Sequence, residues 1–344
     1  MEQGYFSGTT GRNRPRLPSQ RIVFDAQAES GGLTNALTVD VEDYFHVSAF
    51  ESVISPSDWD GMPHRVVGNT MRVLELFAEY KVSGTFFVLG WVAEKYSFLV
   101  RHIAEAGHEI ASHGCSHRRL HHLERAEVRE ELYRSRSLLE DLSGMAVVGY
   151  RAPSWSISSA TLWVLDVLIE LGYLYDSSIF PIYHDLYGIP DAPRLPYVIR
   201  RERGELLEFP PTTVPFSLGG RSWNFPIAGG GYLRLLHPGL VQRGIRYVNQ
   251  KEGSPAVLYF HPWEIDPKQP RVRVGGRSRF RHYLNLDKME QRLRYLLSRN
   301  RFSTMGDVLQ KRVLAEAEEG PSSGVGIRED APAEKGAVPQ QEGL

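Results

Sequence analysis

The sequence has a single cysteine, Cys115, among its 344 residues, so no disulfide can form within one chain. It also lacks net charge, because 40 Lys and Arg residues stand against 41 Asp and Glu, and this balance predicts no nucleic-acid partner. No apolar run approaches the roughly 18 residues needed to span a bilayer, and residues 1–28 lack the apolar segment of a secretory signal. These absences predict a cytoplasmic protein with no membrane span. No pattern in the sequence predicts an oligomeric state.

Two terminal segments lack the hydrophobic periodicity of a folded chain. Residues 1–32 carry scattered Arg, Gly, Ser and Pro, and residues 315–344 are rich in Glu, Gly, Pro, Ser and Ala. Such compositions cannot bury enough apolar surface to fold, so we expect a flexible leader and a disordered tail. The folded part is therefore predicted to lie within residues 33–314.

Short apolar runs alternate with helical patterns in this folded part, which is typical of a parallel α/β architecture. Strands are predicted at residues 37–41, 84–89, 108–112, 147–150, 173–175 and 256–260, and helices at 66–80, 98–106, 125–142 and 160–171. Polar residues follow several of these strands, namely Asp40, His113, Arg151, Asp176 and His261. Because active sites of parallel barrels collect at the C-terminal strand ends, this recurrence predicts a catalytic face.

Residues 181–238 break the alternation. The segment contains nine prolines and the glycine runs Gly219-Gly220 and Gly229-Gly230-Gly231, which do not suit a regular strand–helix unit. We interpret it as an irregular insertion that shapes one wall of a cleft. A structural elaboration without substrate contact is the alternative.

His113 and His117 are the first candidate metal ligands. Imidazoles at positions i and i+4 of a helical turn face the same side and can share one ion. His pairs at this spacing also arise by chance, and the neighbouring His121 and His122 are competing candidates in what looks like an exposed stretch. Cys115 is a ligand by chemistry, but between the two histidines it would point elsewhere.

A metal site with two imidazoles usually needs a carboxylate, and three acids end the first strand. Side chains two residues apart in a strand share a face, so Asp40 and Glu42 would converge while Asp43 points away. If the chain turns immediately after Asp40, Asp43 would turn inward instead. The alternative for all three is a set of solvated loop acids.

The later strand ends supply the remaining groups of a metallohydrolase. Arg151 could orient a catalytic carboxylate through two hydrogen bonds, Asp176 adds an acid, and His261 is flanked by aromatic residues. In this hypothesis Asp40 takes a proton from water as general base, and His261 protonates the leaving amine as general acid.

The order of these motifs, from Leu37 to His261, resembles the polysaccharide deacetylase family typified by the NodB chitooligosaccharide deacetylase. The family opens with two adjacent aspartates, a base and a metal ligand. Here Asp40 matches the base, but Val41 stands at the second position. Relatives with an Asp-x-Asp opening place the metal acid two residues on, which favours Glu42 and leaves Asp43 as the substitute.

The other family motifs match in order. The histidine motif corresponds to His113 and His117, and the Arg-x-Pro motif to Arg151 and Pro153. The resemblance implies that Arg151 steadies the base and pairs with Asp176, and that His261 ends the late leucine–histidine motif as the acid. It also implies a distorted (β/α) barrel, an α/β fold with fewer than eight complete strands.

Several strings narrow the resemblance to deacetylases found beside exopolysaccharide gene clusters of the exosortase type. They are Asp-Val-Glu-Asp-Tyr-Phe, Tyr-Arg-Ala-Pro-Ser, Gly-Gly-Gly-Tyr and Phe-His-Pro-Trp-Glu. That subgroup carries a region after the catalytic barrel. The resemblance therefore implies a barrel over residues 33–262 and a C-terminal extension over residues 263–314 that packs on it.

The implied activity is removal of N-acetyl groups from an N-acetylated oligo- or polysaccharide, of the exopolysaccharide or cell-wall type. One divalent ion is implied, with zinc expected and cobalt or another divalent ion as alternatives. Two other functions stay open at this point. One is a cyclic-amide hydrolase similar to allantoinases on the same fold, and the other is a catalytically inactive carbohydrate-binding protein.

Overall fold

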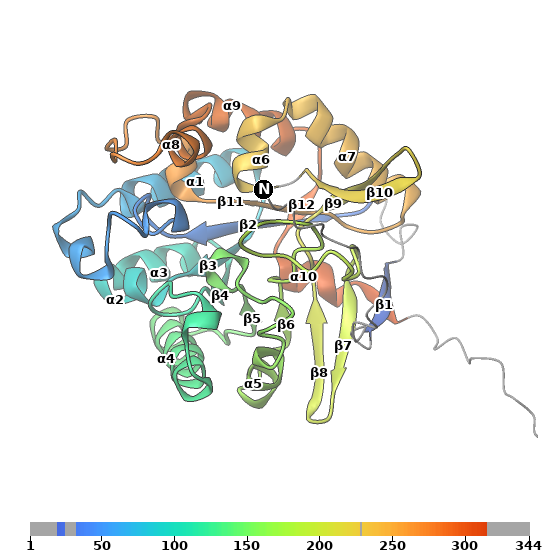
Figure 1. The fold of residues 1–344 in the computed structure, drawn as a ribbon, viewed down its shortest axis with the longest axis horizontal. Helices are drawn as coiled ribbons and strands as arrows, with labels where there is room; N and C mark the ends of the chain where they lie inside the picture. The colour runs from blue at the N-terminus through green and yellow to red at the C-terminus, as the bar shows by residue number, and fades with distance from the viewer. Residues whose placement is uncertain (1–18, 25–31, 228, 315–344) are drawn as a thin grey trace, which may run out of the picture. The chain divides into compact units, whose positions relative to one another are not determined.

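The computed structural model describes residues 19–24, 32–227 and 229–314 (Figure 1). Most of the expected leader and the expected tail lie outside these residues. Within the leader, however, residues 19–24 form strand β1 (Ser19–Phe24), which pairs antiparallel with β7 (Tyr197–Arg201) and β13 (Arg312–Leu314). Ile22 and Phe24 are buried there. The expectation of a flexible leader is therefore wrong for this segment, whose short apolar alternation contributes to the core.

One twisted sheet organises the fold, with the strand order β11-β2-β3-β4-β5-β6-β8-β7-β1-β13. Its remaining strands are β2 (Asn35–Val41), β3 (Thr85–Val88), β4 (Glu109–Ser112), β5 (Gly149–Tyr150), β6 (Tyr175–Asp176), β8 (Gly204–Glu208) and β11 (Val257–Phe260), and β12 (Phe302–Ser303) pairs with β2. Strands from β11 to β8 run parallel. Their carboxyl ends therefore meet on one side.

Helices surround the sheet (Figure 1). They are α1 (Val66–Tyr80), α2 (Gly90–Lys95), α3 (Ser97–Glu105), α4 (Arg125–Ser143), α5 (Val164–Glu170), α6 (Gly230–Leu235), α7 (Pro238–Lys251), α8 (Gly276–Tyr283), α9 (Leu286–Leu297) and α10 (Met305–Gln310). Short 3₁₀ helices lie at η1 (Ser48–Phe50), η2 (Pro56–Gly61), η3 (Leu120–His122), η4 (Pro153–Trp155) and η5 (Pro262–Ile265). The expected distorted α/β barrel is confirmed.

The longest helix shows why the sequence folds this way. A capping box between Glu124 and Glu127 begins α4, and Gly144 ends it in the left-handed conformation. Its buried side chains, Val128, Leu132, Ser135 and Leu139, follow one another at spacings of four, three and four residues and so form one stripe that faces the sheet. Strand β2 is buried at every position, as expected of a central parallel strand covered on both faces.

The segment at residues 181–238 is more regular than expected. Strands β7 and β8 form a hairpin, and β8 pairs parallel with β6, so this part completes the main sheet. Strands β9 (Thr213–Leu218) and β10 (Arg221–Pro226) form a separate two-stranded sheet. The expected irregularity is wrong for these strands, whereas residues 184–187 and 230–232 of the segment line the cleft that contains the candidate site. The prolines of the segment lie largely between the strands, and Tyr197, Ile199 and Leu206 are buried strand residues.

The residues that follow β11, up to residue 314, pack against the barrel and extend its core. Helix α9 contacts η5, α6 and α7, and β12 adds to the beginning of β2. Among the described residues, no helix is long and apolar enough to cross a bilayer.

Candidate active site

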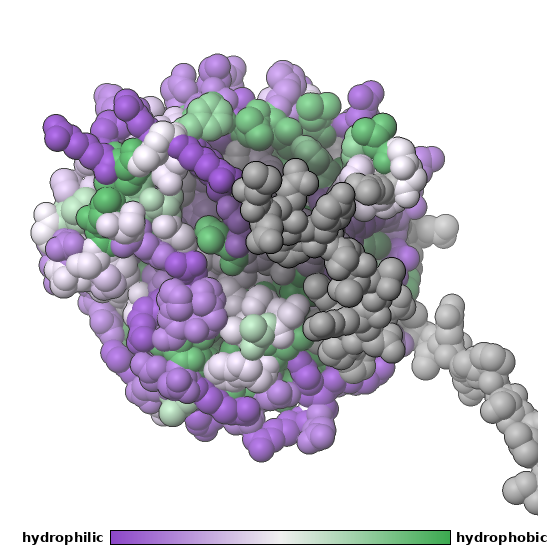
Figure 2. All heavy atoms as spheres, in the orientation of Figure 1, coloured by the Kyte–Doolittle hydropathy of each residue, from purple (hydrophilic) through white to green (hydrophobic). Residues whose placement is uncertain are grey.

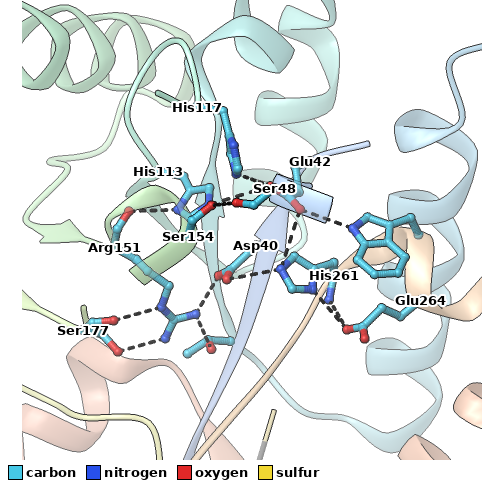
Figure 3. Close-up of polar contacts among 12 residues, drawn as sticks. Asp40, Glu42, Ser48, His113, His117, Arg151, Ser154, Ser177, His261 and Glu264 are labelled. Carbon is cyan, nitrogen blue, oxygen red and sulfur yellow. Dashed lines mark hydrogen bonds and ion pairs between the residues drawn. The ribbon is translucent and has the colours of Figure 1, made fainter. Parts of the chain in front are cut away.

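A cleft of about 970 Å³ opens at the carboxyl ends of the parallel strands. Asp40 from β2, His113 after β4 and His261 after β11 line it, as do Glu42 and His117. The structure thus brings together five of the eight site residues named from the sequence. Arg151, after β5, lies directly behind them (Figure 3).

Glu42, His113 and His117 form a group that could hold a metal ion. Glu42 Oε2 lies 2.6 Å from His117 Nε2 and 4.0 Å from His113 Nε2. All three side chains are buried, and their potential ligand atoms lie within 4.8 Å of one another. One carboxylate and two imidazoles match the ligands of catalytic divalent-metal sites.

The protonation pattern also fits a cation. His113 Nδ1 lies 2.8 Å from the carbonyl oxygen of Arg151, which can only accept, so Nδ1 carries the proton and Nε2 keeps its lone pair. Burial lowers the pKa of His113 to about 4, which keeps the ring neutral. Glu42 Oε2 is buried without a hydrogen-bond partner among the described residues, because its short contact with His117 lacks hydrogen-bond geometry. A bound cation would satisfy this oxygen.

The histidines reach this position by a route other than the expected one. Residues 113–117 form a loop after β4, in which Gly114 and His117 have φ values of +73° and +54°. The prediction of a helical turn is therefore wrong, because left-handed residues interrupt any helix. Glu131 on α4 holds the loop, since its carboxylate accepts hydrogen bonds from the backbone nitrogens of Cys115 and Ser116, each at 3.0 Å.

Asp43 does not join the metal group. Its carboxylate accepts hydrogen bonds from the backbone nitrogens of Tyr44, Arg65 and Val66 at 2.6–2.9 Å, and so caps the beginning of α1. Glu42 instead shares the face of Asp40, as strand alternation indicates. His121 and His122 are exposed and also lie outside the group, while Cys115 is buried.

Arg151 holds the predicted base through a buried ion pair. Its Nη1 lies 2.6 Å from Asp40 Oδ1 and also donates to Thr38 Oγ1 at 2.9 Å (Figure 3). Its other nitrogens donate to the carbonyl and hydroxyl oxygens of Ser177. The guanidinium carbon lies 4.1 Å from the ring centre of Phe87, so water does not compete for these bonds.

The expected pairing of Asp176 with Arg151 is not present. Asp176 Oδ1 accepts a 2.5 Å hydrogen bond from Ser178, and its carboxyl group interacts with that of Glu208. It does not line the cleft. Burial raises the pKa of Asp176 to about 6 and that of Glu208 well above its usual value. Because Asp176 precedes Ser177, its side chain takes the other face of the strand end.

His261 faces the cleft between two carboxylates. Its Nε2 lies 3.8 Å from Asp40 Oδ2 and 3.7 Å from Glu42 Oε1, and its Nδ1 lies 3.1 Å from Glu264 Oε2 (Figure 3). Burial alone would lower the pKa of His261, but the negative charges of Glu42, Glu264 and Asp40 raise it to about 9. The imidazole is therefore protonated at neutral pH.

Sequence reasoning missed the residues that orient His261. Glu264 pairs with Arg234 at 2.6 Å, and both side chains are buried. Arg234 comes from α6, 30 residues away along the chain, and also donates to the carbonyl oxygen of His282. The only local signal is that Glu264 follows His261 by three residues, the spacing of the capping box in η5.

Two family models match consecutive segments of this chain, and each segment contains part of the candidate site. Residues 58–175 match the family model described as polysaccharide deacetylase, and residues 177–310 match a domain of unknown function, DUF3473. Over residues 58–175, about a third of its length, the chain is similar to the polysaccharide deacetylase family. Its predicted base, Asp40, precedes both matched segments, whereas His261, Glu264 and Arg234 all lie in the second. The second segment therefore contributes residues directly to the candidate site.

Curated relatives match only in part. A peptidoglycan deacetylase from Helicobacter pylori is 30% identical over 159 residues, which cover 46% of this chain and 48% of that protein. A peptidoglycan-N-acetylglucosamine deacetylase from Bacillus cereus is 34% identical over 84 residues, or 24% of this chain and 30% of the relative. The chain thus aligns with about half or less of the length of these relatives.

The fold has a counterpart in a solved structure of a candidate polysaccharide deacetylase from Mycobacterium smegmatis. That structure has a TM-score of 0.56 at 24% identity, covering 88% of this chain and all of the other. At this identity the likeness supports the α/β barrel fold alone and does not extend to activity.

Proposed function

We propose that this protein is a metal-dependent N-deacetylase that removes acetyl groups from amino sugars of a polysaccharide. The observation that carries the proposal is the arrangement of a held carboxylate and a protonated imidazole beside the metal group. Asp40 and His261 face the same cleft, and Glu42, His113 and His117 lie next to them. Amide hydrolysis needs a base and an acid at the same pH, and these two groups meet that need.

The roles follow from the partners of each side chain. Arg151 donates to Asp40 Oδ1 and is itself positioned by its hydrogen bond to Thr38 Oγ1, which leaves Asp40 Oδ2 to receive a proton from water in the cleft. His261 Nε2 donates its proton to the amide nitrogen as the carbon–nitrogen bond breaks, which releases the free amine and acetate. Glu264 holds His261 Nδ1 so that Nε2 points into the cleft. When bound by Glu42, His113 and His117, a divalent ion would supply Lewis-acid polarisation of the amide carbonyl.

The volume of the cleft admits both a segment of a polymer and a small cyclic amide. Its volume of about 970 Å³ is at the upper end of the roughly 300–1,000 Å³ usual for small-molecule sites. A Puue allantoinase shares the fold with a TM-score of 0.53 at 16% identity, covering 88% of this chain and 97% of the other. This likeness reflects the common barrel, so allantoin belongs in the test as a competing substrate.

Acetate release decides between the functions. We would incubate the full chain with chitopentaose, peptidoglycan glycan strands and allantoin, and measure acetate, free amines and ring opening. The proposal expects acetate and amine in equal amounts from an acetylated glycan, and neither product from an Asp40→Asn variant. Ring opening of allantoin alone would support the cyclic-amide hydrolase. Glycan binding without acetate release, in metal-loaded protein, would support the inactive binder.

Three finer assignments belong to the same proposal. We propose zinc as the ion, since the ligand set of two imidazoles and one carboxylate suits it. We propose an exopolysaccharide as the natural polymer because of the sequence strings shared with exosortase-associated deacetylases. We also propose that the protein acts in the cytoplasm. Metal analysis of the purified protein tests the zinc assignment. Measurement of polymer acetylation in a deletion strain tests the exopolysaccharide, and cell fractionation tests the cytoplasmic location.

A further inference from the structure

One stretch of the chain beside the cleft carries positive charge only. Between Asp266 and Asp287 the sequence has no acidic residue, although the whole chain has a net charge of −1. The basic residues of this stretch are Lys268, Arg271, Arg273, Arg277, Arg279 and Arg281. Figure 2 shows hydrophilic side chains projecting from the region where α8 lies in Figure 1.

Two of these arginines face the cleft. Arg277 and Arg281 are four residues apart on α8 and line the cleft together with Phe280 and Leu284. Positions i, i+3, i+4 and i+7 share one face of a helix. Arg279 lies on a different face of the same helix and does not line the cleft.

The charges of these two arginines are largely unneutralised. Arg277 Nη2 lies 3.8 Å from Asp185 Oδ2, with the two side chains 75% and 52% exposed, so this pair is weak. Arg281 forms no ion pair with any described residue. Acids elsewhere in the cleft already have cationic partners: Glu51 lies 2.5 Å from Arg119, and Glu264 is paired with Arg234.

Helix α8 is also held in a defined position relative to His261. The His282 ring stacks on Trp263 with centroids 4.4 Å apart, and Trp263 stacks on His261 at 5.2 Å. His282 Nε2 is hydrogen-bonded to Gln269 Oε1 at 2.7 Å, and its carbonyl oxygen accepts from Arg234. A cationic face is thus connected through buried rings to the predicted general acid.

We infer that α8 forms a subsite for a carboxylate-bearing sugar, held by Arg277 and Arg281 near the acetylated sugar. Arginine suits this ligand because its planar fork can donate two hydrogen bonds to one carboxylate. The inference rests on the proposed function and narrows its substrate to an anionic glycan. The carboxylate could belong to a uronic acid or to the lactyl group of muramic acid.

A binding measurement tests the subsite without relying on catalysis. Tetragalacturonate carries four carboxylates and no acetamide, so its dissociation constant can be measured by calorimetry with the active full chain. We expect the Arg277→Gln/Arg281→Gln variant to bind about tenfold more weakly, the usual order for one or two charge-assisted hydrogen bonds. Arg279→Gln, the matched control on the same helix, should stay within about twofold. Absence of binding, or equal losses in both variants, would overturn the subsite.

Substrate comparison distinguishes the two sources and separates this inference from the proposed function. Deacetylation rates would be measured on chitohexaose, on a hyaluronan hexasaccharide and on a muramic-acid-containing glycan. We expect the double variant to lower kcat/KM on one anionic glycan about tenfold while chitohexaose changes less than twofold. A loss shared equally by chitohexaose would overturn the subsite but leave deacetylation intact. Inactivity on all three would overturn the deacetylase, whereas the binding result would stand.

Discussion

Arg151 and Asp40 form an ion pair with almost no solvent contact, in which the side chains are 0% and 3% exposed and Nη1 lies 2.6 Å from Oδ1. The carbonyl oxygen of Arg151 also fixes the tautomer of His113. One residue therefore orients both the predicted base and a predicted metal ligand.

Removal of Arg151 should reduce stability and activity together. Arg151→Met leaves the Asp40 carboxylate buried without its cation, so we expect the free energy of unfolding to fall by about 3–5 kcal/mol. Chemical denaturation measures this change, and kcat/KM should fall with it. The Asp40→Asn/Arg151→Met double variant should recover part of the stability. Arg200→Met, which removes an exposed pair with Glu205, is the control and should change stability by no more than about 1 kcal/mol.

Glu42 and Asp43 should have separable effects on metal content. Glu42→Gln weakens the only carboxylate of the metal group, so we expect purified protein to lose most of its metal. Asp43→Asn should keep its metal but lose roughly 0.5–2 kcal/mol of stability, because Asp43 caps α1. Elemental analysis and thermal unfolding measure the two effects. Metal loss in the Asp43 variant alone would show that the ligand assignment is wrong.

The fall of kcat/KM at alkaline pH should follow the loss of the proton from His261. The imidazole must be protonated to donate, so kcat/KM falls as pH rises through its pKa, which the surrounding carboxylates raise to about 9. A cation beside Glu42 offsets part of that charge, so we expect the fall at a pH somewhat below 9. Glu264→Gln should move the fall to lower pH, whereas Glu51→Gln, another acid of the cleft, should not. His261→Ala should lower kcat by roughly 10²–10⁴.

If Glu264 only maintained the fold, its variant would lose rate without any shift of the alkaline fall. If the pH of the alkaline fall in kcat/KM is unchanged in Glu264→Gln, then Glu264 does not position His261. Undiminished turnover in His261→Ala would remove His261 itself from the mechanism.

Gly229 allows α6 to approach the strand that ends in His261. A Cβ atom at this position would lie 1.6 Å from Tyr259 Cε1, so Gly229→Ala must displace the ring or the helix. We expect a loss of about 1–3 kcal/mol in stability and a fall in kcat, because α6 carries Arg234. Gly68→Ala in α1 is the matched control. Its Cβ would meet nothing within 4 Å, so it should be neutral or stabilising.

Local patterns in the sequence predicted those parts of the molecule that depend on neighbouring residues. Helix α1 was predicted with its observed bounds because its apolar residues are strongly periodic, and α4 was predicted within one residue because it also has a capping box and a terminal glycine. The preference for Glu42 over Asp43 followed from the alternation of side chains along β2. The geometry agrees with that preference, and the metal role itself stays a prediction.

The remaining parts depend on contacts between distant residues. Arg234 and Glu264 meet only because α6 packs beside η5, and no spacing in the chain signals this. The pairing of Arg151 with Ser177 instead of Asp176 depends on which face of a two-residue strand each side chain takes. The left-handed conformation of His117 was likewise not evident, because only a few per cent of residues other than glycine adopt a positive φ.

Reconstitution of chelated protein tests the central claim most directly. Full chain would be stripped of metal, titrated with zinc, and assayed for acetate release from an acetylated glycan at each step. We expect activity to rise in proportion to bound metal and to level off at one ion per chain, with His117→Ala neither binding zinc nor releasing acetate. Full acetate release by the stripped protein, or undiminished activity in His117→Ala, would contradict the account.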